Sequence, residues 1–471
     1  MNDTYTSPFS QRYASKYMTE LFSPYTRIKT WRKLWTSLAS AQSKLGLNIT
    51  EQQVKELRDN IENIDFECAK QREKQVRHDV MAHIYAYSQV APNAAGIIHL
   101  GATSCFVTDN ADLVIYRDAL IYIRNELKKV IANLCDFATE YKNTPTLGYT
   151  HYQPAQLVTV GKRAALWLQD FMFDYDELNF VIENLKFRGC QGTTGSCASL
   201  LELFGGNSEK IKELNKMIAN DFGFEECYDV CSQTYSRKVD SRILNVLSAI
   251  AQSASKMAND IRLLQHDRLL FEPFEKDQIG SSAMPYKRNP MRCERICSLA
   301  RYLMTNSENA SSTAAVQWLE RTLDDSAIRR ISMPEGFLCA DAILRLAQNV
   351  TSNLVVNENA VNKKLKEYLP FIATENLMME GVKMGASRQE LHAIIRECSL
   401  KAIEDMDNGL ECNLLSLLAE RKDFPLDKEQ MEDILDPMLY IGLSAKQVED
   451  LVEKLKPITE STDRNNAQID V

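Results

Sequence analysis

Two long stretches of the chain repeat apolar residues at an alternating spacing of three and four. The first passes through Leu113, Tyr116, Leu120, Ile123, Leu127, Val130 and Leu134, and the second through Val239, Ile243, Val246, Ile250, Ser253 and Met257. This spacing places the residues on one face of a helix, as in a coiled-coil seam. Helices of this length pack at small crossing angles, so we predict an all-α fold built on a helix bundle.

Other features divide the chain. A third long helix is predicted over 157–188, and a fourth is predicted to begin near Pro290, because proline suits the first turn of a helix. A chain of 471 residues is long enough for two or three domains. We predict three helical domains: a mixed N-terminal domain over 1–105, a central long-helix bundle over 106–356 and a smaller C-terminal domain over 357–471.

Small residues are interleaved along the segment 239–270. They are Ser248, Ala249, Ala251, Ser253, Ala254 and Ser255. Small residues let helices approach closely, either within one chain or between subunits, and the sequence leaves both arrangements open.

Charge and composition exclude several classes of protein. The net charge of -9 is unlike that of a nucleic-acid binder, so an anionic ligand must be bound where cations converge. The six histidines form no H-E-x-x-H motif, which argues against a metal site. The twelve cysteines include the pairs Cys227/Cys231 and Cys293/Cys297 at helical spacing, which is typical of buried thiols. No apolar stretch could span a membrane and no secretory signal is visible, so a cytoplasmic protein is expected.

Two segments in the first quarter of the chain carry polar groups suited to an anion. Arg77-His78-Asp79 places a cation, an imidazole and a carboxylate in consecutive positions. Thr103 and Ser104 follow Gly101 just before a long helix, where hydroxyl and N–H groups can bind a carboxylate or phosphate. Taken alone, each segment also fits an ordinary helix start.

Two later segments are more specific. His151 lies within Thr-His-Tyr-Gln-Pro-Ala-Gln, residues 150–156, and histidine can give a proton near neutral pH. A hydrogen-bonded loop histidine is the alternative. Residues 280–290 read Gly-Ser-Ser-Ala-Met-Pro-Tyr-Lys-Arg-Asn-Pro, which combines hydroxyls, cations and an amide between two prolines. No packing requirement explains that mixture, whereas a loop that meets an anion and moves a proton would need it.

These four segments, in this order, resemble the motifs of the fumarase/aspartase superfamily, and the resemblance covers essentially the whole chain. Tyr286, Arg288 and the Arg77-His78-Asp79 segment resemble its adenylosuccinate lyase branch. Fumarase and aspartase usually carry glycine and valine at positions 286 and 288, and argininosuccinate lyase usually carries glutamine and lysine. The alternatives are argininosuccinate lyase, another lyase of the superfamily, or an inactive structural homologue like the lens crystallins.

The resemblance implies a C–N lyase of purine biosynthesis. It would release fumarate from adenylosuccinate, giving AMP, and from the succinyl-carboxamide ribotide SAICAR, giving AICAR. The substrate's own carboxylate acts as the electron sink, so no metal or organic cofactor is expected. The resemblance also implies a homotetramer whose active sites are each built from three subunits, with no nucleic-acid or membrane partner.

The resemblance further assigns roles to individual residues. Ser281 is the expected general base, with Lys287 favouring its alkoxide, although the neighbouring Ser282 could be confused with it. His151 is the expected general acid, and Glu294 is a candidate for the carboxylate that keeps it protonated. The expected substrate-binding residues are Arg12, Tyr13, Arg77, His78, Asp79, Thr103, Ser104, Thr150, Gln233, Asn289, Arg295, Arg321, Ser326 and Arg330.

Overall fold

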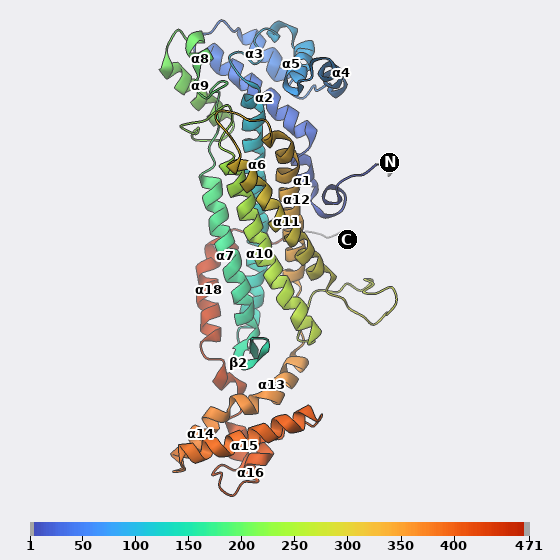
Figure 1. The fold of residues 1–471 in the computed structure, drawn as a ribbon, viewed down its shortest axis with the longest axis vertical. Helices are drawn as coiled ribbons and strands as arrows, with labels where there is room; N and C mark the ends of the chain where they lie inside the picture. Colours follow the sequence, from blue (N-terminus) through green and yellow to red (C-terminus); the bar gives the residue numbers. More distant parts are fainter. Residues whose placement is uncertain (1–3, 466–471) are drawn as a thin grey trace.

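The computed structural model describes residues 4–465 as an elongated, mostly helical molecule (Figure 1). A bundle of long helices forms its middle, with shorter helices at either end. The predicted all-α class is confirmed. No helix within the described residues is long and apolar enough to cross a membrane.

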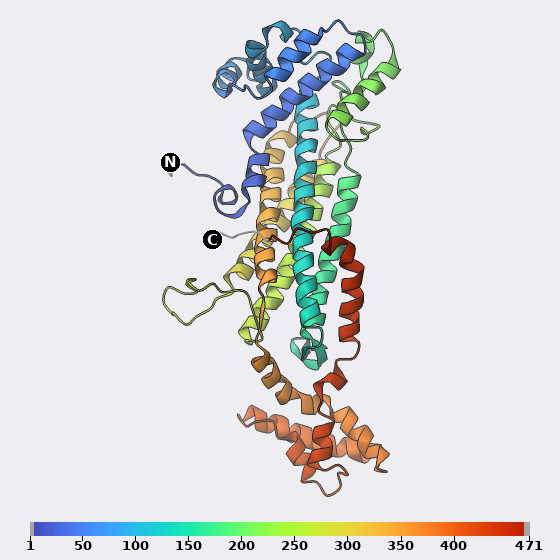
Figure 2. The same cartoon turned by 180° about the vertical axis from the view of Figure 1, so that it is seen from behind.

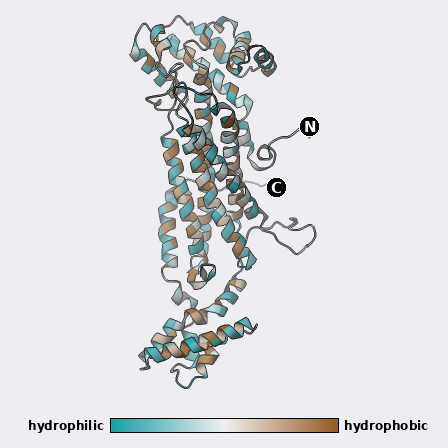
Figure 3. Ribbon diagram, in the orientation of Figure 1, coloured by the Kyte–Doolittle hydropathy of each residue, from teal (hydrophilic) through white to brown (hydrophobic). Residues whose placement is uncertain are grey.

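The bundle contains the longest helices of the chain. They are α6 (Ser104–Glu140), α7 (Val160–Glu183), α10 (Lys238–His266), α11 (Met291–Ala315) and α12 (Asp325–Ser352). The seam from Leu113 to Leu134 lies on α6 and is buried at every position, and the apolar members of the second seam are buried on α10. Both seams therefore face the core, as their spacing predicts. Figure 3 shows the hydrophobic and hydrophilic residues alternating along these helices.

The start of the third predicted helix is wrong. Residues 153–159 form a strand, β2 (Gln153–Thr159), which pairs antiparallel with β1 (Pro145–Thr150), and α7 begins only at Val160. The helix also ends at Glu183 rather than at 188. The fourth helix, α11, begins directly after Pro290, in agreement with the prediction. A second small sheet joins β3 (Leu270–Phe271) to β4 (Val355–Val356).

The end of the bundle where α6 begins is covered by α2 (Pro24–Lys44), α3 (Glu51–Asp59), α4 (Phe66–Val76), α5 (Asp79–Val90), η2 (Pro92–Ala94), α8 (Ala198–Leu203) and α9 (Ser208–Asp221). The first two elements, η1 (Phe9–Tyr13) and α1 (Lys16–Leu21), lie along α12. Helix α2 packs on both α6 and α9. The N-terminal segment and a segment from the middle of the chain therefore meet at this end of the molecule (Figure 1).

The opposite end holds a second, smaller core. It is formed by α14 (Thr374–Lys383), α15 (Arg388–Asp407), α16 (Leu414–Ala419) and α17 (Lys428–Asp433), while α13 (Glu358–Ile372) joins it to the bundle and buries its own apolar residues in the main core. After η3 (Pro437–Tyr440), helix α18 (Ser444–Thr459) runs back along α6 and α7 of the bundle (Figure 2). The three predicted domain boundaries stay a prediction, and residues 1–3 and 466–471 lie outside the described part of the chain.

The twelve cysteines are all free thiols. Cys231, Cys293 and Cys297 are buried and Cys227 is half-buried. Burial raises the pKa of Cys227 to about 12 and that of Cys231 to about 11. Cys293 and Cys297 lie on α11 and are packed as small hydrophobic groups, as their helical spacing predicts. Cys227 and Cys231 lie in the segment between α9 and α10, which is not helical, so the helical spacing expected for that pair is wrong.

Candidate active site

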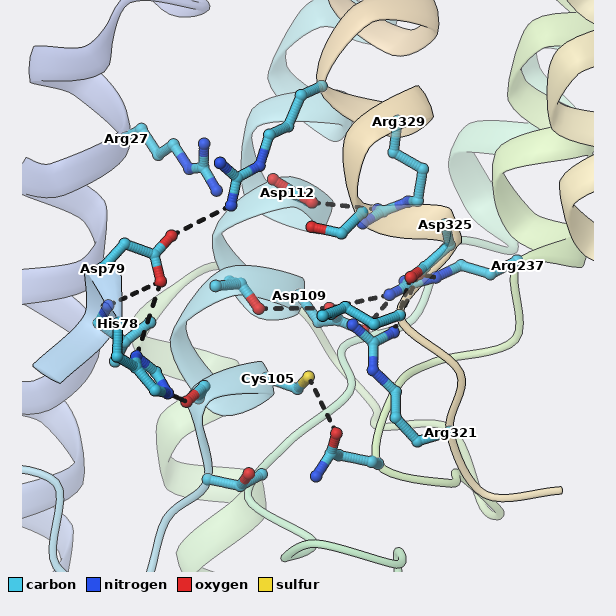
Figure 4. A pocket seen from close by; sticks show the side chains of 18 of the residues that line it. Arg27, His78, Asp79, Cys105, Asp109, Asp112, Arg237, Arg321, Asp325 and Arg329 are labelled. Atoms are coloured by element: carbon cyan, nitrogen blue, oxygen red, sulfur yellow. Dashed lines mark hydrogen bonds and ion pairs between the residues drawn. The ribbon is translucent and has the colours of Figure 1, made fainter. Parts of the chain in front are cut away.

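A pocket of about 680 Å³ opens where the N-terminal helices meet the bundle (Figure 4). Its walls come from α2, the junction of α4 and α5, the start of α6, the segment before α10 and the start of α12. Segments far apart in the sequence therefore supply one cavity. Polar and charged side chains form most of its lining.

Three helices begin at this pocket. His78 and Asp79 lie at the start of α5, Ser104 is the first residue of α6, and Asp325 is the first residue of α12. The N-terminus of a helix carries a partial positive charge and unpaired N–H groups. Three such termini at one cavity favour a ligand with several negative groups.

The backbone at Arg77 and His78 sets the direction of α5. Arg77 ends α4 in the left-handed conformation, with φ 56°, and His78 caps α5 by accepting a hydrogen bond from Met81 N at 3.4 Å. The other ring nitrogen of His78, Nε2, lies 3.3 Å from Ser104 Oγ. His78 therefore connects the starts of α5 and α6 across the pocket.

A buried network of ion pairs forms the inner wall. Arg237 bonds to both Asp109, with Nη1 to Oδ2 at 3.0 Å, and Asp325, with Nε to Oδ2 at 2.6 Å. Asp325 also accepts two bonds of 3.0 Å from Arg321 Nη1. Arg237 and Asp325 are almost fully buried, so this wall is a rigid arrangement of opposite charges.

A second branch of the network centres on Arg329. Its Nε lies 2.6 Å from Asp240 Oδ2 and its Nη2 lies 3.0 Å from Asp112 Oδ2. Tyr235 donates its hydroxyl to Asp240 Oδ1 at 2.6 Å, while its backbone N–H donates to Asp109. Tyr235 thus links the two branches, one through its backbone N–H and the other through its hydroxyl.

The network shifts the acidity of its members. Burial alone would raise the pKa of Asp109, but Arg237 and Arg329 outweigh it and hold that pKa below its usual value. Burial raises the pKa of Asp112 in spite of the opposing charges of Arg329 and Arg27. Burial also raises the pKa of the Cys105 thiol to about 11, so this pocket residue is not an activated nucleophile.

Half of the predicted site residues line this pocket. They are Arg77, His78, Asp79, Thr103, Ser104, Gln233, Arg321, Ser326 and Arg330. Arg330 Nη2 lies 3.1 Å from Asp79 Oδ2, which joins the start of α12 to that of α5. The segments identified by sequence therefore do meet in space.

The predicted acid lies elsewhere. Thr150 and His151 are exposed at the turn between β1 and β2, at the far end of the bundle from the pocket. His151 and Tyr152 have φ of 51° and 60°, the left-handed region that a two-residue hairpin loop requires. Neither residue is glycine, so the turn carries backbone strain while it presents the imidazole to solvent.

The predicted base lies on a loop that projects from the bundle between α10 and α11 (Figures 1 and 2). Ser281 Oγ accepts hydrogen bonds from the backbone N–H groups of Ala283 at 3.3 Å and Met284 at 3.1 Å. Asn289 Nδ2 donates to Gly280 O at 2.7 Å and closes the base of the loop. A Cβ at Gly280 would lie 2.0 Å from Lys287 O, so this crossing requires glycine.

The remaining predicted residues lie near this loop or the N-terminus. Arg295 on α11 lies over the ring of Tyr13 with its Cζ 5.6 Å from the ring centroid, and Arg12 lies 6.0 Å from the same ring. Glu294 and Lys287 are exposed. Within the described residues no hydrogen bond or ion pair joins Glu294 to His151. One chain thus places the predicted residues in three separate groups.

Several pocket residues were missed by sequence reasoning. They are Arg27, Asp109, Asp112, Arg237, Asp325 and Arg329. Asp109 is buried on α6, where the buried positions are otherwise mostly apolar, and Asp112 lies half-buried on the same helix. Carboxylates at such positions were the available signal, because buried charges need partners.

Comparison with known proteins agrees with this architecture. Residues 3–304 match a family model described as "Lyase", and residues 370–451 match one described as "Adenylosuccinate lyase C-terminus". The fold is shared with fumarate lyase from Mesorhizobium sp. BNC1, with a TM-score of 0.80 and 24% identity over 96% of this chain and 99% of that chain. It is also shared with the 3-carboxy-cis,cis-muconate lactonizing enzyme from Pseudomonas putida, with a TM-score of 0.84 and 22% identity over 96% and 99%. The class is therefore a lyase built on a long helical bundle.

Relatives that match over nearly the full chain identify the family within this class of lyases. The adenylosuccinate lyase of Saccharomyces cerevisiae is 49% identical, over 96% of this chain and 95% of its own. That of Schizosaccharomyces pombe is 47% identical, over 96% and 94%. The chain belongs to the adenylosuccinate lyase family, which confirms the resemblance seen in its motifs.

Proposed function

We propose that this protein eliminates fumarate from adenylosuccinate, giving AMP, and from SAICAR, giving AICAR. Each substrate carries a phosphate and two succinyl carboxylates. The observation that best supports the proposal is the meeting of three helix N-termini and six arginines at one pocket. An enzyme that stabilises a highly charged carbanion-like intermediate needs this kind of electrostatic environment.

Ser281 is the proposed general base. Its alkoxide removes a proton from the succinyl carbon next to a carboxylate, and the electron pair moves into that carboxylate. The two backbone N–H groups that donate to Ser281 Oγ would stabilise negative charge on the oxygen. Lys287, on the same loop, would add a positive charge when the loop closes over the substrate.

His151 is the proposed general acid. As the C–N bond breaks, His151 gives a proton to the departing nitrogen, and fumarate forms from the remaining carbons. Its strained, exposed turn supports this role, because strain of this kind is concentrated at functional sites. Glu294 would keep His151 protonated across a subunit boundary, since the two are not in contact within one chain.

We propose a homotetramer whose active sites each combine three subunits. The separation of His151, the Ser281 loop and the pocket within one chain supports this arrangement. A stripe of exposed apolar residues on α7 also supports it: Leu166, Phe173 and Phe180 follow one another at intervals of seven and are 48%, 61% and 53% exposed.

The other predicted residues would bind the substrate. Those of the pocket would surround one part of it, while Arg12, Tyr13, Thr150, Asn289 and Arg295 would approach from other subunits. Free thiols on every cysteine fit a reducing compartment, so we place the protein in the cytoplasm.

A direct assay tests the function. The purified protein is mixed separately with adenylosuccinate, SAICAR and argininosuccinate, and fumarate release is followed by coupled absorbance. Turnover of the first two substrates, with none of argininosuccinate, is the expected result. Turnover of argininosuccinate alone would assign the protein to a different reaction, and no turnover of any substrate would favour a structural role.

A further inference from the structure

Six arginines line the pocket, and they differ in how their charge is balanced. Four of them form salt bridges with carboxylates: Arg237, Arg321, Arg329 and Arg330. Among the described residues, no carboxylate forms a salt bridge with either Arg27 or Arg77. Arg77 is already among the predicted binding residues, whereas Arg27 is not.

Arg27 is held in place by its own helix. It lies one turn before Trp31 on α2, and its Cζ is 5.1 Å from the centroid of that indole, which is 1% exposed. The Nε of Arg27 is buried and has no hydrogen-bond partner among the described residues. A guanidinium stacked on a buried aromatic ring is well oriented and has lost part of its hydration.

The position of Arg27 points to the interior of the pocket. Figure 4 shows its guanidinium between Asp79 and Asp112, far across the pocket from Arg321. Burial raises the pKa of Asp112, and the positive charge of Arg27 acts to lower it. The electrostatic field of Arg27 therefore reaches a carboxylate that lines the cavity. An oriented, partly desolvated cation without a carboxylate partner is stabilised by an anion supplied from outside the chain.

We infer that Arg27 is a further substrate-binding residue, which contacts an oxyanion of the substrate at the α2 side of the pocket. This inference rests on the proposed function, because that function brings a phosphate and two carboxylates to the cavity. Arg330, whose Nη2 lies 3.1 Å from Asp79 Oδ2, adds a second cation on the same side of the pocket. Arg27 would then complete the ring of cations around the ligand.

Steady-state kinetics with adenylosuccinate provide the first test. Arg27→Met keeps the apolar stem over Trp31 and removes the charge, and it should raise KM by about 10- to 100-fold, as expected for a charge-assisted hydrogen bond. We expect kcat to change by less than about threefold, because the contact is present in both ground state and transition state. Arg27→Lys should recover part of the loss. Arg27→Gln takes the place of Arg27→Met if the latter does not fold.

Lys33→Met is the matched control. Lys33 is an exposed cation on the same helix and does not line this pocket. Its kinetic constants should equal those of the wild type. Similar melting curves by circular dichroism would show that the variants differ in binding rather than in folding.

Calorimetric titration with AMP and with fumarate identifies the oxyanion. Weakened AMP binding with unchanged fumarate binding would assign Arg27 to the phosphate, and the reverse would assign it to a succinyl carboxylate. Unchanged KM and unchanged affinity for both probes would overturn the inference. Failure of the wild type itself to bind AMP or turn over adenylosuccinate would instead overturn the proposed function.

Discussion

Asp325 is a fully buried carboxylate between two arginines, and its charge holds both of them. Replacing it in Asp325→Asn would leave the buried Arg237 with less negative charge in a place that water does not reach, and would remove the carboxylate that holds Arg321 at the pocket wall. Loss of one partner from a buried ion pair typically costs about 3–5 kcal/mol. We expect a loss of that size in the free energy of unfolding, measured by urea denaturation, together with weaker substrate binding through Arg321.

Asp324→Asn is the control for this substitution. Asp324 is the preceding residue and is exposed, and Gln317 Nε2 donates a hydrogen bond to its Oδ1 at 3.3 Å. Its removal should change the unfolding free energy by less than about 0.5 kcal/mol. Equal effects of the two substitutions would mean that the buried network contributes no special stability.

The sequence predicted the polar pocket residues better than the charged residues behind them. Arg77, His78, Thr103 and Ser104 lie in compact motifs, where unusual neighbours reveal a site. Asp109 and Arg237 instead meet across more than a hundred residues of chain. Their pairing depends on the packing of α6 against the segment before α10, and no local pattern predicts that contact.

Gly161 shows how closely two elements approach. Its N–H donates to Tyr141 O at 2.9 Å where α7 begins beside the end of α6. A Cβ there would lie 2.3 Å from Ala138 O and 2.7 Å from the Lys142 backbone. Gly161→Ala should therefore destabilise the protein by about 1–3 kcal/mol, seen as a lower urea midpoint. Gly96→Ala meets no atom within 4 Å and should be neutral or stabilising.

Asp174 makes the packing of α7 against α10 dependent on pH. It is 5% exposed, and burial raises its pKa to about 7. A hydrogen bond with Ser253 on α10 favours the ionised form and lowers the pKa, but burial has the larger effect. The unfolded chain loses this proton near pH 4, whereas the folded chain keeps it until about pH 7. The folded protein therefore binds more protons across that window, and its stability falls as the pH rises from about 4 to 7.

Asp174→Asn removes this titration. Relative to the wild type, the variant should gain about 2–4 kcal/mol in unfolding free energy between pH 4 and pH 8, because the cost of ionising the buried carboxyl disappears. Urea denaturation at several pH values measures the difference. Parallel stability curves for the two proteins over this range would contradict the assignment.

Elements with long repeats were predictable, and the hairpin was not. Seven buried residues at regular spacing determine α6 without reference to the rest of the chain. The strand β2 depends on pairing with β1, where Leu157 faces Leu147 and Thr159 faces Pro145. The same residues fit a helix when read alone, so the predicted helix began too early.

At the scale of the whole molecule, the three separate groups predict complementation between inactive variants. His151→Ala and Ser281→Ala should each lower kcat by at least about 100-fold, as expected for loss of an acid or a base. After subunit exchange in an equal mixture, about a quarter of the sites would receive an intact His151 and an intact Ser281 from different subunits. Fumarate release by the mixture measures this recovery.

Sites contained in one chain would give no recovery, since every chain in the mixture lacks one group. Exchange must be demonstrated independently, for example with differently tagged chains. Absence of recovery despite full exchange would contradict the shared site. The sequence could not determine this arrangement from its periodicity, because a seam within one chain and a seam between chains have the same spacing.

With the proposed site shared between subunits, the distance between the β1–β2 turn and the pocket would make catalysis depend on enzyme concentration. A chain that has separated from its neighbours would retain its fold and its anion pocket but would have no proton donor near the bound ligand. Specific activity should therefore fall on dilution below the dissociation constant of the assembly, while affinity for AMP declines much less. In a cell at low enzyme concentration, doubling the amount of enzyme would then more than double the rate of fumarate release.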